Sequence, residues 1–226
     1  MKKINVIILF FIVSSLSSCN KWKEPTDVDF FVDINKTPTL NDKITFTGGE
    51  IILESFDFDA QRDKGEDVIF TQNFTNGLAI PFNINQIVEE LEFVIPQGYY
   101  KRIDIGFRTF DNNENICLLV LGNYQYSNGD LIPFRFEFTD TEQFKIRAED
   151  DNGNDIILDK DIVSPAKIIL NPSYWFQPIP SNDFENATIS QVNGINTIQI
   201  NKNVNDNIYD LILNRIGESA TIIFNY

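Results

Sequence analysis

Histidine is absent from the 226-residue chain, and cysteine occurs only as Cys19 and Cys117. A Ser-His-Asp or Cys-His catalytic apparatus is therefore excluded, and so are zinc, copper and non-haem iron sites that depend on histidine ligands. Cys117 lies within the apolar run 116–121, which favours a buried, unreactive thiol over a nucleophile.

Basic residues are also few, since 18 lysines and arginines stand against 33 aspartates and glutamates, for a net charge of −15. A surface of this charge repels nucleic acid and anionic lipid headgroups, and no basic run offsets it. We therefore expect no nucleic-acid partner.

The apolar run at residues 6–13 is too short to span a membrane, because it covers about 12 Å as a helix against a hydrocarbon core of roughly 30 Å. It follows Lys2 and Lys3 and precedes Leu16-Ser17-Ser18-Cys19. A basic stretch, a short apolar stretch and a site with small residues, in this order, are typical of a signal peptide. We predict that residues 1–18 are such a peptide.

The motif that ends at Cys19 resembles the lipobox of bacterial lipoproteins. This resemblance implies cleavage before Cys19 and acylation of its thiol, with palmitate among the acyl chains; more than one chain holds a protein stably on a membrane. We expect a lipid anchor to the outer membrane, on the periplasmic or the surface side. An ordinary secretory signal with a chance cysteine is the alternative. Loss of the two signal lysines lowers the basic residues from 18 to 16 against 33 acids, a net charge of −17.

The rest of the chain divides into a short polar tether at 19–27 and a single domain at 28–226. Apolar and polar residues alternate through most of this domain, as half-buried strands require. The candidate strands are residues 28–34, 43–46, 50–58, 67–74, 78–82, 91–95, 103–109, 115–126, 132–138, 144–148, 155–158, 167–170 and 196–200. Turn dipeptides separate many of them: Gly48-Gly49, Asn76-Gly77, Gln97-Gly98, Asn128-Gly129, Asn152-Gly153 and Asn193-Gly194.

Many short strands without long helical periodicity predict an all-β fold, an antiparallel β-sandwich or a partly open barrel. The segment 164–226 is interpreted as a C-terminal extension that carries one short helix and a last strand at 220–226. Asn203 or Asn205 is a suitable helix cap, and Gly217 a suitable stop. The apolar face of this helix consists of Ile208, Leu211, Ile212 and Ile216.

Carboxylates suggest two kinds of site. Asp57, Asp59 and Asp63 are candidate calcium ligands, although the spacing fails as an EF-hand loop and a solvated turn explains the same residues. Asp57 and Asp59 also share a strand face at about 7 Å, within the range of an inverting glycosidase. Nothing else marks them as catalytic, so we expect no enzyme and no cofactor.

Aromatic residues are abundant, with 20 phenylalanines and 7 tyrosines. Most phenylalanines alternate with polar residues and belong to the core. Tyr99, Tyr100, Tyr174 and Trp175 are the candidate ligand-binding residues, because an aromatic plane can stack on the apolar face of a sugar ring. Tyr174 and Trp175 lie in the segment 171–178, which has no strand or helix period, so at least one aromatic there is a candidate for exposure. Burial of this segment as a plug over the sandwich end is the alternative that we favour.

Several motifs together resemble a group of uncharacterised β-sandwich lipoproteins of Gram-negative cell envelopes. They are the lipobox, Gly48-Gly49-Glu50, residues 95–100 and residues 171–176. The chain is more distantly similar to fimbrillin-type subunits, which polymerise through a donated strand. Neither resemblance implies catalytic residues.

Three functions follow as hypotheses. The first is a non-catalytic envelope lipoprotein that binds a glycan or another envelope protein. The second is an adhesive or pilus-type subunit that assembles by strand addition at an exposed sheet edge. The third is a carboxylate-based glycoside hydrolase.

Overall fold

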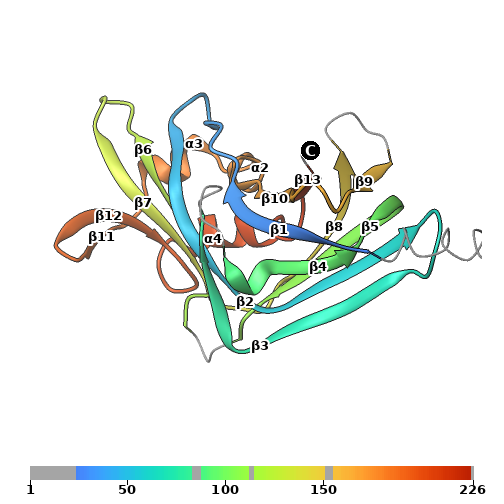
Figure 1. The fold of residues 1–226 in the computed structure, drawn as a ribbon. Helices are drawn as coiled ribbons and strands as arrows, with labels where there is room; N and C mark the ends of the chain where they lie inside the picture. The colour runs from blue at the N-terminus through green and yellow to red at the C-terminus, as the bar shows by residue number, and fades with distance from the viewer. Residues whose placement is uncertain (1–23, 83–87, 112–114, 151–154, 225–226) are drawn as a thin grey trace, which may run out of the picture.

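The computed structural model describes residues 24–82, 88–111, 115–150 and 155–224, and the described chain is mostly β, with one large curved sheet and a few short helices (Figure 1). Its strands are β1 (Pro25–Ile34), β2 (Ile44–Arg62), β3 (Val68–Pro81), β4 (Glu92–Pro96), β5 (Gly98–Thr109), β6 (Leu118–Gln125), β7 (Leu131–Phe138), β8 (Gln143–Asp150), β9 (Ile156–Leu158), β10 (Ser164–Leu170), β11 (Ile189–Val192), β12 (Ile195–Ile200) and β13 (Thr221–Phe224). Its helices are the 3-10 turn η2 (Glu89–Leu91) and α2 (Pro172–Phe176), α3 (Ser181–Glu185) and α4 (Asp206–Leu213).

The sheet runs in the order β11-β12-β7-β6-β2-β5-β8-β13-β10-β1-β4, with β3 on the side of β2 and β9 on the side of β5. Most pairs are antiparallel, but β1 with β10, β7 with β12 and β8 with β13 are parallel. The expected purely antiparallel pairing is therefore wrong at these three places. Each of them involves a strand from 164–226, because this segment inserts its strands beside earlier ones and so becomes part of the sheet.

The N-terminal strand begins earlier than expected. Residues 25–27, expected in the tether, belong to β1 and pair with β4, and Thr26 is buried with its hydroxyl donating to the carbonyl of Asp159 at 2.8 Å. The predicted signal peptide, Cys19 and residues 20–23 lie outside the described residues, as do the turn Asn152-Gly153 and the last two residues of the expected final strand.

The pair Gly48-Gly49 lies inside β2 and does not form the turn that we expected. The register of β2 against β6 shifts between Phe46 and Gly48, which makes this position a bulge. A Cβ atom on Gly49 would lie 1.9 Å from the carbonyl oxygen of Leu119, so only glycine allows β6 to approach. Glycine inside a strand commonly marks a bulge or such a close approach.

The pair Asn76-Gly77 also lies within a strand, β3. The register of β2 against β3 shifts between Leu53 and Ser55, and Gly77 has φ of +73° in the extra length of β3 opposite this point. The dipeptide therefore supplies a left-handed residue for a bulge. By contrast, Asn128-Gly129 and Asn193-Gly194 do separate strands, as expected, whereas Gln97 alone lies between β4 and β5 and Gly98 begins β5.

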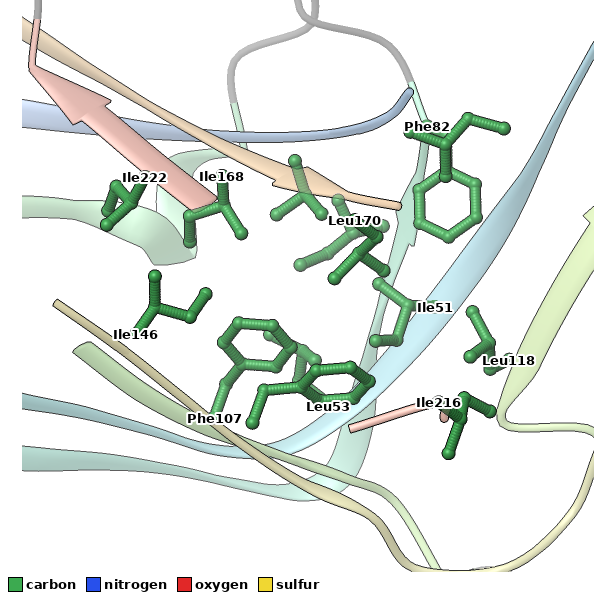
Figure 2. Packing of buried hydrophobic residues seen from close by; sticks show 14 of the residues in the cluster. Ile51, Leu53, Phe82, Phe107, Leu118, Ile146, Ile168, Leu170, Ile216 and Ile222 are labelled. Carbon is green, nitrogen blue, oxygen red and sulfur yellow. The ribbon is translucent and has the colours of Figure 1, made fainter. Parts of the chain in front are cut away.

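Two groups of elements cover the inner face of the sheet. Phe30 of β1 contacts Phe56 of β2 at 4.9 Å between ring centroids, and Figure 2 shows Ile168 and Ile222 of β10 and β13 pointing toward Phe107 and Ile146 of β5 and β8. The helices cover the other part, over the start of β2, β6 and β7. Their ring contacts are Phe46 with Phe176, Phe134 with Phe176, Tyr124 with Phe184 and Phe136 with Tyr209.

The single helix expected near the C-terminus is one of three α-helices in the described chain. α4 buries Ile208 and Ile212, two residues of the expected face. Asn205 is the N-cap residue, one of the two expected, with φ of +54°; its side chain makes no capping hydrogen bond, because it accepts one from the amide of Thr188 at 2.7 Å. α2 forms in the segment expected to be irregular, since Asn171 accepts from the amide of Tyr174 and a proline occupies the first turn.

A cluster of hydrogen bonds to Glu185 connects α3 to the sheet. The carboxylate accepts hydrogen bonds from the Ser127 hydroxyl at 2.7 Å, the Lys43 ammonium at 2.9 Å and the Tyr124 hydroxyl at 2.9 Å. These partners come from the β6–β7 turn, the residue before β2, and β6. The Ser127 hydrogen bond and the Lys43 charge lower the pKa of Glu185 to about 2.

We expect Glu185→Gln to destabilise the fold at neutral pH. Because the folded-state pKa is lowered from 4.5 to about 2, this contribution of the carboxylate is fully present above about pH 4.5 and is lost as the pH falls toward 2. Urea unfolding at a series of pH values measures the difference between wild type and variant. Glu90→Gln, at an exposed position in η2, is the control, and a Glu185→Gln effect that is equally large near pH 2 contradicts the assignment.

Candidate binding site

The outer face of the sheet carries charged residues from β2, β5 and β8. Along these strands, residues such as Phe56, Phe58 and Ile105 point inward and are buried. Alternation therefore places their neighbours, including Asp57 and Asp104, on the outer face. Strand pairing brings these charges side by side, because β5 lies between β2 and β8.

A hollow of about 600 Å³ opens on this face. In one row of the sheet, Asp57 pairs with Gly106, and Gly106 pairs with Lys145. Gly106, which has no side chain, lies between Asp57 and Lys145 in this row, so the side chain of Asp57 packs closely over it; a Cβ there would lie 3.1 Å from Asp57 Oδ2. The residues that line it are Asp57, Asp59, Asp104, Ile105, Gly106, Gln143, Lys145, Ile146 and Arg147.

A chain of ion pairs forms one wall of the hollow. Arg102 contacts Asp59 at 2.7 Å and Asp104 at 2.5 Å, and Arg147 contacts Asp104 at 2.8 Å. Hydrogen bonds from Arg147 and Arg102 hold the pKa of Asp104 below its usual range. The Asp104 carboxylate is therefore kept in its charged, hydrogen-bond-accepting form.

The charges around the hollow balance. Asp57, Asp59 and Asp104 contribute three negative charges, and Lys145, Arg147 and the adjacent Arg102 contribute three positive ones. Asp57 accepts a hydrogen bond from the Thr71 hydroxyl at 2.6 Å. The hollow thus offers both donors and acceptors without a net charge, in a chain whose total is −15.

The expected calcium residues do not converge. Asp57 is bonded to Thr71 and Asp59 to Arg102, whereas Asp63 forms an exposed ion pair with Lys101 at 2.9 Å. In the described part of the chain, no group of three histidines, cysteines, aspartates or glutamates is placed to hold a metal ion. The calcium hypothesis is corrected, because separate cationic or hydroxyl partners take up the three carboxylates.

Two of the four aromatic candidates are fully buried. Trp175 is 0% exposed within α2, and its indole nitrogen donates to the carbonyl of Glu218 at 3.1 Å. Tyr100 is also 0% exposed, and its hydroxyl donates to the carbonyl of Pro96. Burial raises the pKa of Tyr100 to about 12. Neither ring is a stacking surface, so the sugar-stacking hypothesis is wrong for both, and the alternative of a buried plug holds for Trp175.

The other two aromatic candidates lie apart from the hollow. Tyr174 is half-buried, with the Arg215 guanidinium 4.6 Å from its ring centroid and its hydroxyl bonded to Glu218 at 3.0 Å. Tyr99 is exposed on β5, where it pairs with Ile157 of β9. The structure therefore does not bring the four aromatic residues together in one platform.

The thiol of Cys117 is buried and free, as expected. It donates to the carbonyl of Asp140 at 3.0 Å, and burial raises its pKa to about 11. A thiol in this environment is protonated at neutral pH and is a poor nucleophile.

No helix among the described residues is long and apolar enough to cross a membrane. No family model, curated protein or solved structure matches the chain. The resemblance to envelope lipoproteins therefore stays a prediction from its motifs.

Of the residues that line the hollow, only Asp57 and Asp59 were expected from the sequence to belong to a site. Alternation alone places Asp104 and Lys145 on an outer face, so their exposure was visible in the sequence. What was not visible is the order of β2, β5 and β8, which makes one site of three separate strands. The signal that could have drawn attention to the site is Gly106, a glycine in the middle of an alternating strand.

We expect Trp175→Ala to destabilise the protein by about 3–5 kcal/mol, the usual cost of removing a large aromatic side chain from a core. Tyr99→Ala is the comparison, because its side chain is exposed and its removal is expected to cost about 0.5 kcal/mol or less. Urea unfolding, followed by far-UV circular dichroism, measures the free energy of unfolding of both variants. Equal stability of the two variants contradicts the placement of Trp175 in the core.

Proposed function

We propose that this protein is a lipid-anchored protein of the bacterial cell envelope with a non-catalytic binding role. The anchor is supported by the order of Lys2 and Lys3, the apolar run 6–13 and the lipobox-like motif that ends at Cys19. The first strand of the domain begins at Pro25, so only a few residues would separate an acylated Cys19 from the sheet. Over this length the chain reaches roughly 20 Å, and the domain would stay close to the membrane surface.

Labelled palmitate tests the anchor directly. We expect the wild-type protein, expressed in a Gram-negative host, to incorporate the label and to fractionate with membranes. Cys19→Ala is expected to lose the label and the membrane association, whereas Cys117→Ala is the matched control and is expected to retain both. Unlabelled wild-type protein, or membrane-bound Cys19→Ala, contradicts lipidation.

The binding role is assigned to the hollow over Gly106, and a neutral glycan is the ligand that fits it best. The carrying observation is a cavity of about 600 Å³ whose three carboxylates are balanced by three cationic groups. An uncharged ligand rich in hydroxyl groups can donate to the carboxylates and accept from Lys145 and Arg147 without bringing an unbalanced charge. The site would therefore recognise sugar hydroxyl groups by hydrogen bonds, in place of the aromatic stacking that the sequence suggested.

The carboxylates around the hollow support binding without catalysis better than they support a glycosidase. A glycosidase needs one carboxylic acid that remains protonated to donate to the leaving group. Arg147 and Arg102 instead lower the pKa of Asp104, and Arg102 also pairs with Asp59. Of the candidate catalytic pair, Asp59 forms an ion pair with Arg102 and Asp57 accepts a hydrogen bond from Thr71, contacts that support the binding role.

We also propose that the sheet folds over itself as a β-sandwich. The support is the ring contact between Phe30 of β1 and Phe56 of β2, together with the contacts of Phe30 to Phe58 and Phe93. In this arrangement the hollow lies on the outer surface of one layer, away from the core.

An array of neutral and acidic oligosaccharides tests the glycan hypothesis. We expect binding to neutral members, weakened at least about tenfold in Gly106→Val, which fills the hollow, and in Lys145→Gln, which removes a donor. Lys36→Gln changes the charge by the same amount outside the hollow and is expected to bind as the wild type does. Thermal melts verify that the variants are folded. Absence of any bound oligosaccharide, or unchanged binding in Gly106→Val, rejects this ligand.

A further inference from the structure

Among the described residues, the longest sheet edge without a neighbouring strand belongs to β3. This strand pairs with β2 on one side, and no other described strand pairs with it. Figure 1 shows β3 along the lower margin of the molecule, with β2 on its other side. An unpaired edge presents a row of backbone N–H and C=O groups that can accept a further strand.

The sequence of β3 is unusual for this chain because it carries no charge. Charged residues make up 23% of the protein, yet none occurs among the 14 residues of Val68–Pro81. Exposed edges are normally protected by lysines, by inward-pointing charges or by shortness. β3 has none of these protections along its first part, residues 68–73, which pair with β2 without a register shift.

Residues 68–73 have the composition of a segment that pairs readily. Their sequence is Val-Ile-Phe-Thr-Gln-Asn, which is rich in residues with high β-propensity and lacks proline and glycine. Ile69 is 72% exposed, the highest value among the large apolar side chains of the described chain. A second strand would cover this side chain and satisfy the free backbone groups.

We propose that β3 pairs with β3 of a second copy of this chain, antiparallel and about a two-fold axis, so that the two sheets become continuous. The distribution of charge favours a second copy of this chain as the partner. Two chains of net charge −15 repel one another over most of their surfaces, and β3 is an edge where they can meet without opposing charges. An antiparallel edge is also complementary to itself, which a two-fold dimer requires.

The acidic residue directly before β3 does not oppose this pairing. Asp67 precedes the strand, and in an antiparallel arrangement the two copies of Asp67 fall at opposite ends of the paired segment. Six paired residues extend over roughly 20 Å, which is more than the screening length of about 8 Å at physiological ionic strength. The repulsion between the two carboxylates is therefore weak.

The other edges of the sheet are poorer candidates. β4 has 5 residues and begins with the exposed Glu92, and β11 has 4 residues. The C-terminal strand β13 pairs with β8 on one side and with β10 on the other, so it offers no edge. Strand addition of the kind considered for pilus-type subunits would therefore use β3.

Sedimentation velocity of the full chain in one detergent, over a range of protein concentrations, tests the proposal. We expect the wild type to dimerise, and the double variant Ile69→Lys with Asn73→Lys to dimerise at least tenfold more weakly, because four positive charges then lie close together along the paired edges. Both positions are exposed in the monomer, so the variant is expected to fold, which circular dichroism checks.

The matched control is Val94→Lys with Ile189→Lys, which adds the same two charges at exposed positions on β4 and β11. It is expected to dimerise as the wild type does. A wild type that stays monomeric, with or without another protein bound at β3, overturns the proposal, and so does a β3 variant that dimerises normally. Loss of dimerisation in the control alone would assign the interface to another edge and also reject β3. None of these outcomes depends on glycan binding at the hollow.

Discussion

The bend in β2 is the constraint on which the rest of the structure depends. This strand of 19 residues pairs with β6 along its first part, with β5 along its second part and with β3 on the other side. It can do so because Gly49 admits the backbone of β6 and because the register shifts at Leu53 and Ser55. A straight strand would keep one neighbour along each edge, and the inner face would not divide into a part covered by strands and a part covered by helices.

The alternating pattern of β2 places its apolar residues in the core and its polar residues at the candidate site. Phe56 and Phe58 lie in the aromatic core beneath Phe30, while Asp57 between them faces the hollow. The core therefore sets the position of the carboxylate, since a shift of β2 by one residue would turn the entire pattern over. The same pairing places Gly106 opposite Asp57, so the empty space and the polar groups around it arise from one register.

Charge is distributed unevenly over this acidic protein. The two regions where acidic residues are not in excess are the ones to which we assign roles. Around Gly106 the carboxylates are matched by Arg102, Lys145 and Arg147, and along β3 charges are absent. Elsewhere, excess acid keeps molecules apart. A neutral hollow and an uncharged edge are thus regions where a glycan or a second chain can approach without electrostatic opposition.

Local patterns in the sequence determined most strands, the buried state of Cys117 and the exposure of Asp57, because period-two alternation and apolar runs report burial directly. They failed where a local signal has two meanings. Gly48-Gly49 fits a turn or a bulge equally well, and the segment 171–178 fits a buried plug or an exposed aromatic platform until Asn171 is recognised as the cap of a helix. Only the tertiary structure decided the strand order, the parallel insertion of β10, β12 and β13, and the meeting of Asp57, Gly106 and Lys145. These features depend on which distant segments pair. The backbone hydrogen bonds of a strand are nearly the same with every candidate partner, so local patterns do not identify the partner.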